Sequence, residues 1–327
     1  YSMILLIKAG EMSGTSTYQA LVSRTFGFPG YLLLSVLQFL YPFAAMISYN
    51  IITGDILPKI FQRIPGVTSR SILADRHFAI LSTTIVITLP IALYRNMQRL
   101  GKVSLMSLLF TIIVLLIVIT RTSTLTIPHT DGAWVFAKWN AIQAVGVMSF
   151  VFMCHHACFL IYGSLEKGTV KSWSNITHVS MIISLIISVQ YSVFGYVTFT
   201  GYTQGNVISN VFFAGTLSTL HHFVVTLLVV SVTTVVSLFS DCLGLVLELN
   251  GILSATPLVF IIPTACYLKL SADHWYHWNN AMPCFILLLG ILIMPIGFIM
   301  AILYPQECSH GKEMTYCLLN STHLDVS

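Results

Sequence analysis

Eight continuous apolar blocks constrain this chain more than any other feature. A helix needs about 20 apolar residues to cross the hydrocarbon core of a bilayer. Inside the bilayer the backbone must satisfy its own hydrogen bonds, which a helix does within one segment. The blocks lack the alternation of polar and apolar residues typical of a β-barrel. They cover residues 31–52, 78–94, 103–120, 141–162, 179–200, 223–240, 242–268 and 281–304.

The composition agrees with a membrane protein. Only 8% of the 327 residues are charged and 56% are hydrophobic, whereas a soluble domain carries about a quarter charged residues. The net charge of +4 comes without a basic block, so we expect no nucleic-acid partner. We therefore predict one all-α, polytopic transmembrane helix bundle over residues 1–327, with the lipid bilayer as its surroundings. Residues 1–7 have the pattern of a truncated helix that Lys8 ends, and residues 305–327 that of a tail.

The positive charges predict an orientation, because Lys and Arg gather on the cytoplasmic side of membrane helices. The face that we predict to be cytoplasmic carries Lys8, Arg24, Arg95, Arg99, Lys102, Lys167 and Lys171. The opposite loops carry Lys59, Arg63, Arg70, Arg76, Arg121 and Lys138 over longer stretches, so the bias is one of density rather than of number. The tail carries Cys308, Cys317 and the glycosylation sequon at Asn320, which suit the outside. A Cys308–Cys317 disulfide and a glycan on Asn320 are therefore candidate features. Eight crossings would return the tail to the cytoplasm, and one helix missing near 205–210 would resolve this conflict.

The fourth block contains polar and small residues that a spanning helix rarely needs. A glycine near a serine, here Gly146 and Ser149, can let a helix unwind and expose backbone groups to a solute. The alternative is a packed helix with small residues at its contacts. Tyr41–Pro42 in the first block predicts a kink that frees a carbonyl group. Ordinary helix contact is the competing interpretation there too.

Glu248 is the one charged residue inside a block. A charge within a span costs about 3 kcal/mol on insertion scales, so Glu248 needs a partner or a wet cavity. A proton or cation site is one interpretation, and reaching out to the interface is the other. The pairs His155–His156 and His221–His222 do not favour haem, because neighbours on one helix point in different directions. No Cys-x-x-Cys spacing indicates a metal site, and we predict neither an enzyme nor a bound cofactor.

Several ordered stretches resemble a known family. They are Ser13-Gly14-Thr15, Tyr18-Gln19, 26–30 (FGFPG), Tyr94-Arg95-Asn96, Leu100-Gly101-Lys102, Ser149-Phe150, Cys154-His155 and 248–251 (ELNG). Together they resemble the amino acid/auxin permease family, in particular its sodium-coupled neutral amino acid transporters. The resemblance covers nearly the whole chain. It implies secondary active transport of small neutral amino acids, with sodium as the coupling ion and the plasma membrane as the location.

The resemblance also implies a fold and a site. The family fold has eleven helices, the first ten in two inverted five-helix repeats, with solute and sodium near breaks in the first and sixth helices. The eight blocks then correspond to the third to seventh and ninth to eleventh helices. Both helices of the sodium site are absent from this correspondence, so no metal ligand is assigned. The residues expected to bind substrate are Val145, Gly146, Val147, Met148, Ser149, Phe150 and Asn250. Without those two helices we expect impaired transport. The alternative is a non-transporting interaction or sensor protein that retains part of the fold.

Overall fold

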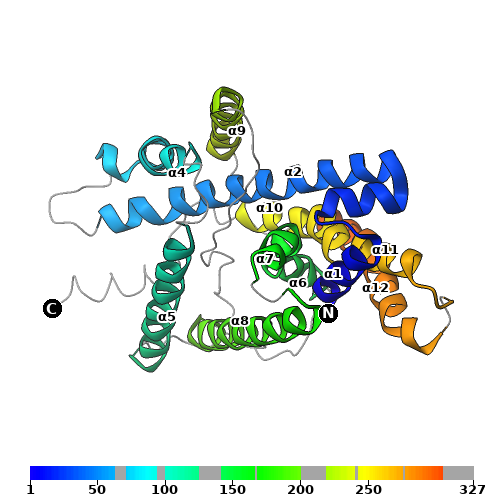
Figure 1. The fold of residues 1–327 in the computed structure, drawn as a ribbon. Helices are drawn as coiled ribbons and strands as arrows, with labels where there is room; N and C mark the ends of the chain where they lie inside the picture. Colours follow the sequence, from blue (N-terminus) through cyan, green and yellow to red (C-terminus); the bar gives the residue numbers. More distant parts are fainter. Residues whose placement is uncertain are drawn as a thin grey trace.

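The structure is a computed structural model that describes residues 1–62, 71–93, 100–124, 141–165, 168–199, 219–239, 242–274 and 277–304. Helices and turns, without a strand, make up these ranges, and the predicted all-α fold class is confirmed (Figure 1). The α-helices are α1 (Ser2–Ser13), α2 (Tyr18–Phe61), α3 (Arg76–Thr83), α4 (Leu89–Leu93), α5 (Leu100–Thr124), α6 (Ala141–Val151), α7 (Cys158–Gly163), α8 (Val170–Phe199), α9 (Thr219–Phe239), α10 (Leu243–Asn250), α11 (Ile262–Leu270) and α12 (Ala281–Leu303).

Five helical stretches are long and apolar enough to cross a membrane, judged over the described ranges alone. They are Tyr18–Pro58, Ala141–Gly163, Val170–Val197, Leu243–Leu270 and Trp278–Leu303. Shorter apolar stretches occupy Met106–Thr120 and Leu227–Phe239. The remaining predicted block, 78–94, holds α3, a π-helical turn at Thr84–Thr88 and α4. Every predicted block therefore contains helix, and the chain is an integral membrane protein by these criteria.

Helix α1 lies inside the bundle, beside α7 and α11 (Figure 1). The predicted end of an apolar stub at Lys8 is wrong, because α1 continues to Ser13. Lys8 is accommodated there since its ammonium donates to the Tyr267 hydroxyl at 3.2 Å and lies 5.1 Å from the centre of that ring. The Trp173 indole also donates to the Met3 carbonyl at 3.2 Å. These contacts fasten α1 to α11 and α8.

Helix α2 changes direction near its start. Gly27, with φ 70° and ψ −161°, is the residue inside α2 with non-helical torsions. A positive φ is accessible to glycine at little cost and strained for other residues. Pro42, where the sequence predicted a kink, lies in continuous helix. The bend at Gly27 therefore separates a short first segment from the long spanning segment. Of the two interpretations open at Pro42, the ordinary helix agrees with the structure.

Four of the described positive side chains lie at one end of the bundle, which we call the cationic end, whereas Arg76 lies at the opposite end. The cationic end carries Lys8, Arg24, Lys171 and Lys269, and the Lys269 ammonium lies 4.7 Å from the Phe26 ring centre. Helix α6 begins at the opposite end, where the Gln143 amide donates to the Tyr304 carbonyl after α12 at 2.8 Å.

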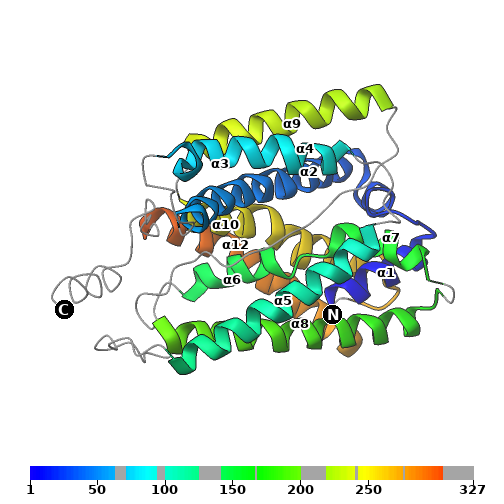
Figure 2. The same cartoon turned by 90° about the vertical axis from the view of Figure 1, so that its left-hand side faces the viewer.

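Successive spans alternate in direction along the described chain, with one exception. Helix α8 starts at the cationic end, where Trp173 reaches α1, and runs to the opposite end. Helix α10 starts at the opposite end, because its Leu243 packs with Ile51 and Ile52 near the end of α2. Helix α9 ends just before α10, so α9 also runs from the cationic end to the opposite end (Figure 2). Helices α8 and α9, which follow each other in the described part of the chain, therefore run parallel.

Candidate functional site: the break between α6 and α7

The fourth block is interrupted in the middle of the bundle. Helix α6 ends at Val151, residues 152–154 are not helical, and a 3₁₀ turn at His155–Ala157 leads into α7. Helix ends leave N–H and C=O groups without partners in the helix, so a break inside an apolar bundle offers polar groups to a solute. The predicted break at 145–150 is wrong in position. These residues are helical, and the Ser149 hydroxyl donates to the Val145 carbonyl at 2.8 Å.

Gly146 has a packing role rather than a breaking one. A Cβ atom at Gly251 would lie 1.9 Å from the Gly146 carbonyl oxygen, and one at Gly146 would lie 2.7 Å from Ile252 Cγ1. The two backbones therefore touch, as small residues allow where membrane helices cross. This contact holds α6 against the π-helical turn Gly251–Ala255 that follows α10. Of the two interpretations open for Gly146, the packed helix therefore agrees with the structure.

Tyr41 on α2 connects the break with α10. Its hydroxyl donates to the Phe150 carbonyl at 3.2 Å, and the two ring centres are 5.2 Å apart. The His156 ring centre lies 5.9 Å from the same tyrosine ring. The Asn250 amide nitrogen donates to the Tyr41 carbonyl at 2.9 Å, while its buried oxygen makes no hydrogen bond to the described residues. Phe150 and Asn250, both predicted to bind substrate, thus meet at Tyr41.

His155 fixes the other side of the break. Its Nε2 lies 2.8 Å from the Ser2 hydroxyl on α1, and the residue is only 2% exposed. Helix α1 therefore braces the interrupted helix. Over the ranges that the structure describes, no group of three or more His, Cys, Asp or Glu side chains could hold a metal ion. The side chains of His221 and His222 lie outside those ranges.

The remaining predicted site residues divide by burial. Gly146, Ser149 and Phe150 are buried, whereas Val145 and Met148 are exposed on the outer side of α6 and Val147 is half-buried. The sequence analysis missed Ser2 and Gln143. Gln143 had a visible signal, since it is an amide in an otherwise apolar stretch. The described residues do not include the predicted disulfide cysteines Cys308 and Cys317, the sequon at Asn320 or the junction at 205–210. Cys242, at the start of α10, is disulfide-bonded.

Glu248 does not reach out to the interface. Its side chain is fully buried within α10, so of the two interpretations open from the sequence, the exposed one is wrong. Neither carboxyl oxygen makes a hydrogen bond of ordinary geometry to the described residues.

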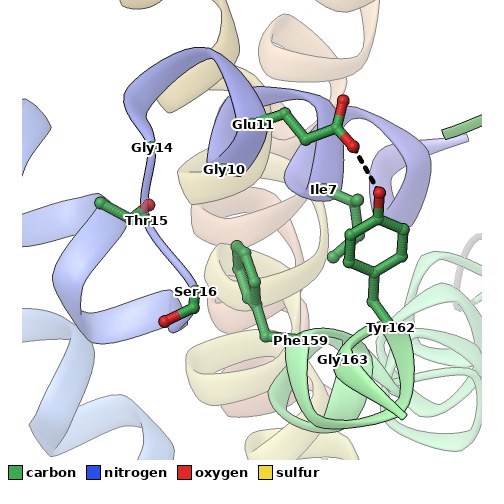
Figure 3. Close-up of a pocket in the computed structure, with 9 residues that line it drawn as sticks. All are labelled: Ile7, Gly10, Glu11, Gly14, Thr15, Ser16, Phe159, Tyr162 and Gly163. Atoms are coloured by element: carbon green, nitrogen blue, oxygen red, sulfur yellow. Dashed lines mark hydrogen bonds between the residues drawn. The ribbon is translucent and has the colours of Figure 1, made fainter. Parts of the chain in front are cut away.

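A cavity of about 370 Å³ opens at the cationic end between α1 and α7 (Figure 3). Phe159 and Tyr162 form its α7 wall, with Glu11, Thr15 and Ser16 across from them. The Tyr162 hydroxyl donates to the Glu11 carboxylate at its rim. The cavity therefore lies beside the half-helix that follows the break, and the sequence analysis did not predict it.

Comparison with known proteins agrees with this architecture. The family described as "Transmembrane amino acid transporter protein" matches residues 1–219 and 212–303. A cattle protein named "Putative sodium-coupled neutral amino acid transporter 11" is 54% identical over 355 positions, which cover 97% of this chain and 77% of that protein. A human protein of the same name is 53% identical, with 97% and 87% covered. Baker's yeast "Vacuolar amino acid transporter 2" is 25% identical, with 96% and 76% covered.

Proposed function

Because the chain belongs to the transmembrane amino acid transporter family, we propose that it forms the pathway of a secondary transporter for small neutral amino acids. The observation that carries the proposal is the interrupted helix α6–α7, enclosed by α1, α2 and α10 in the middle of the bundle. The names of the cattle and human relatives support sodium as the coupling ion. A transporter, rather than an enzyme, is the function that this family supports.

The solute site is proposed at the last turn of α6 and the first turn after the break. The Phe152 and Met153 carbonyl groups and the Cys154 N–H, which make no backbone hydrogen bond in the described part of the chain, would bind the polar ends of an amino acid, as broken helices do in other transporter folds. Phe150 and Ser149 from α6 and the unpartnered amide oxygen of Asn250 border this place. The cavity beside Phe159 and Tyr162 then forms the route from the site to the cationic end.

We further propose that this chain lacks one crossing between α8 and α9, and that it transports poorly for this reason. The parallel course of the two helices supports this, and so does the alignment with the cattle protein. That alignment runs over 355 positions while the chain has 327 residues, so at least 28 positions of the relative face a gap. This is enough for one span. The family matches 1–219 and 212–303 also meet in the same region.

The cationic end is proposed to be cytoplasmic, following the distribution of Lys and Arg. The disulfide of Cys242 at the opposite end supports this, because disulfides persist in oxidising compartments. The plasma membrane remains our proposed location, and the name of the yeast relative supplies the competing one, the vacuole. Imaging of the fluorescently labelled chain against markers of both membranes distinguishes them.

Uptake by proteoliposomes tests the function. We compare the chain with a chimaera in which the cattle segment that faces the gap is inserted between Phe199 and Thr219, with and without the relative's residues that precede its matched part. The chimaera is expected to take up radiolabelled glutamine or alanine, and sodium is expected to raise the rate on the order of tenfold, within the usual range of coupling between two sites. The unaltered chain is expected to stay near background.

The matched control carries an apolar helix of equal length and unrelated sequence in the same place. It restores the crossing without family-specific residues and is expected to fold without transporting. Equal uptake by the unaltered chain and the chimaera would contradict the proposed impairment. Folded chimaeras that never move an amino acid would contradict the transport function and favour an interaction or sensor protein.

A further inference from the structure

Glu248 is a buried acid without a counter-charge. It lies on α10, which packs against α2, α6, α12 and the turn Gly251–Ala255. Two positions along a helix turn a side chain by about 200°. Asn250 faces α2 through its bond to the Tyr41 carbonyl, so Glu248 points away from α2, toward α6 and α12. Gln143 on α6 is the polar side chain that lies beside the carboxyl group.

No ion pair joins Glu248 to a described side chain, although α2 carries Arg24 near its start and Lys59 near its far end. Helix α12 and the turn Gly251–Ala255 contain no Lys, Arg, His, Asp or Glu, and α6 contributes only the neutral Gln143. Helix α2 contributes the titratable Tyr41 and Tyr49 and, near its far end, Asp55, which is paired with Arg76 at 3.3 Å. Burying an ionised carboxylate without a partner is strongly unfavourable. The site therefore favours the neutral acid.

The hydrogen bonds of Gln143 lead to the same conclusion. A glutamine amide group has two N–H donors and one acceptor oxygen. The Gln143 amide nitrogen donates to the Met300 carbonyl at 3.3 Å and to the Tyr304 carbonyl at 2.8 Å. These two bonds at the end of α12 use both N–H donors of Gln143. Only the acceptor oxygen is left for Glu248. A carboxyl group can donate to an acceptor only when it carries a proton.

We propose that Glu248 is a proton-binding site, filled in the conformation described here and emptied when α6 separates from α10 and α12. In the release step the carboxyl O–H bond breaks, the proton passes to water that enters between the helices, and the carboxylate remains. Ligands shift a conformational equilibrium only by their difference in affinity between states. A proton bound in one state and lost in the other therefore links pH to the position of α6. The role in transport rests on the proposed function, whereas the bound proton does not.

Infrared spectroscopy of the purified full chain tests the proton directly. At neutral pH the chain is expected to show the C=O stretch of a protonated carboxyl group. This band is lost in Glu248→Gln and kept in Asp273→Asn, the matched loss of an exposed carboxylate in the α11–α12 connection. In Gln143→Met the band is expected to persist at higher frequency, because its hydrogen-bond acceptor is gone. A neutral-pH spectrum without a protonated carboxyl band, or a band unchanged in Glu248→Gln, would overturn the proposal.

The second test concerns the cycle and uses the transporting chimaera. Its uptake is expected to depend on pH, and Glu248→Gln is expected to remove that dependence, since glutamine mimics the neutral acid and cannot release a proton. An unchanged pH profile in Glu248→Gln would reject the link to α6. Should no chimaera transport, the infrared band still decides whether the proton is bound, so the two proposals fail separately.

Discussion

Helices α8 and α10–α11 have nearly the same apolar character and opposite surroundings. None of the most apolar window in Val170–Val197 is buried, whereas 61% of the window in Leu243–Leu270 is. In water such apolar segments would both be driven into the core, but lipid is as apolar as leucine and exerts no such force. Hydropathy therefore finds the spans without telling which of them form the centre.

Close backbone contact accounts for the difference, since α8 contains more Ser and Thr than the buried segment does. The buried helix places Gly251, Ser254 and Thr256 against its neighbours, and the Thr256 hydroxyl donates to the Gly251 carbonyl at 2.9 Å. Helix α8 instead presents large side chains such as Ile182 and Leu185 on its exposed surface. Close backbone approach, rather than hydrophobicity, selects the central helix. We expect three changes in stability, from the largest to the smallest, and the first two test whether the two helices differ in packing.

The largest effect is expected where two backbones touch. Gly251→Ala places a Cβ atom 1.9 Å from the Gly146 carbonyl oxygen, which nearby side chains cannot relieve. We expect a loss of stability at or beyond the upper end of the about 1–3 kcal/mol usual for overpacking. The apparent unfolding temperature of the purified chain in detergent measures it.

The same substitution in α8 is the control. A Cβ atom at Gly195 meets nothing within 4 Å, and alanine favours a helix by up to about 1 kcal/mol over glycine. Gly195→Ala is expected to leave the unfolding temperature unchanged or to raise it. If both variants lose equal stability, α8 is as tightly packed as α10–α11 and the comparison breaks.

A smaller difference is expected between two tyrosine hydroxyl groups. Tyr18 is fully buried and donates to the Leu258 carbonyl at 3.1 Å, within the π-helical turn Pro257–Ile261. Tyr191 on α8 donates to the Thr111 carbonyl at 3.1 Å in a partly exposed place. Tyr18→Phe should cost on the order of 1–2 kcal/mol, because it leaves a buried acceptor unpaired. Tyr191→Phe should cost no more than the average of about 0.6 kcal/mol for bonds between membrane helices. The unfolding temperatures of the two single variants measure this difference. A larger loss of stability in Tyr191→Phe than in Tyr18→Phe would contradict the comparison between the buried and the exposed helix.

The sequence predicted the helices of this fold well and their interruptions poorly. Continuous apolar blocks determine spans because the bilayer leaves the backbone few alternatives. Gly27 was not singled out, although its positive φ turns α2, while a kink was one of two interpretations of Pro42, where the helix stays regular. Proline can remain in a membrane helix when neighbours satisfy the freed groups. Which proline or glycine bends a helix thus depends on partners that are remote in sequence.

The sequence predicted an interruption in the correct block but placed it at 145–150, whereas the helix is interrupted at 152–154. The sequence left open whether Gly146 breaks its helix or packs against another, and its absent side chain admits Gly251 from another helix. Nothing local distinguishes a glycine that unwinds from one that packs. The contribution of α1 was also hidden, because the contact between Ser2 and His155 joins residues 153 positions apart. Tyr41 and Asn250 were each noticed, but their hydrogen bond appears only in three dimensions.

The smallest effect is expected at an exposed helix end, outside both spans compared above. Asp75 precedes α3 and accepts from the His77 backbone N–H at 2.8 Å, and this bond holds the pKa of its carboxyl group below the ordinary 3.8. A carboxyl group with a lowered folded pKa stabilises fully above the ordinary value. That contribution is lost as the pH falls from 3.8 through the folded value.

Asp75→Asn keeps a capping side chain without a titrating group. The His77 ring also lies 3.3 Å from the Asp75 carboxylate, so the comparison is made below the pH range in which histidine changes charge. The difference in unfolding temperature between the chain and Asp75→Asn should be constant from about pH 5 down to about 4. It should shrink below that value, by less than about 0.5 kcal/mol in free energy, since solvent screens an exposed carboxylate. Paired melting curves at descending pH measure it, and the shared titration of the other carboxyl groups cancels in the difference. A change as large as that of Gly251→Ala would mean that exposed ends, rather than the close crossing of α6 and α10, dominate the stability of the bundle.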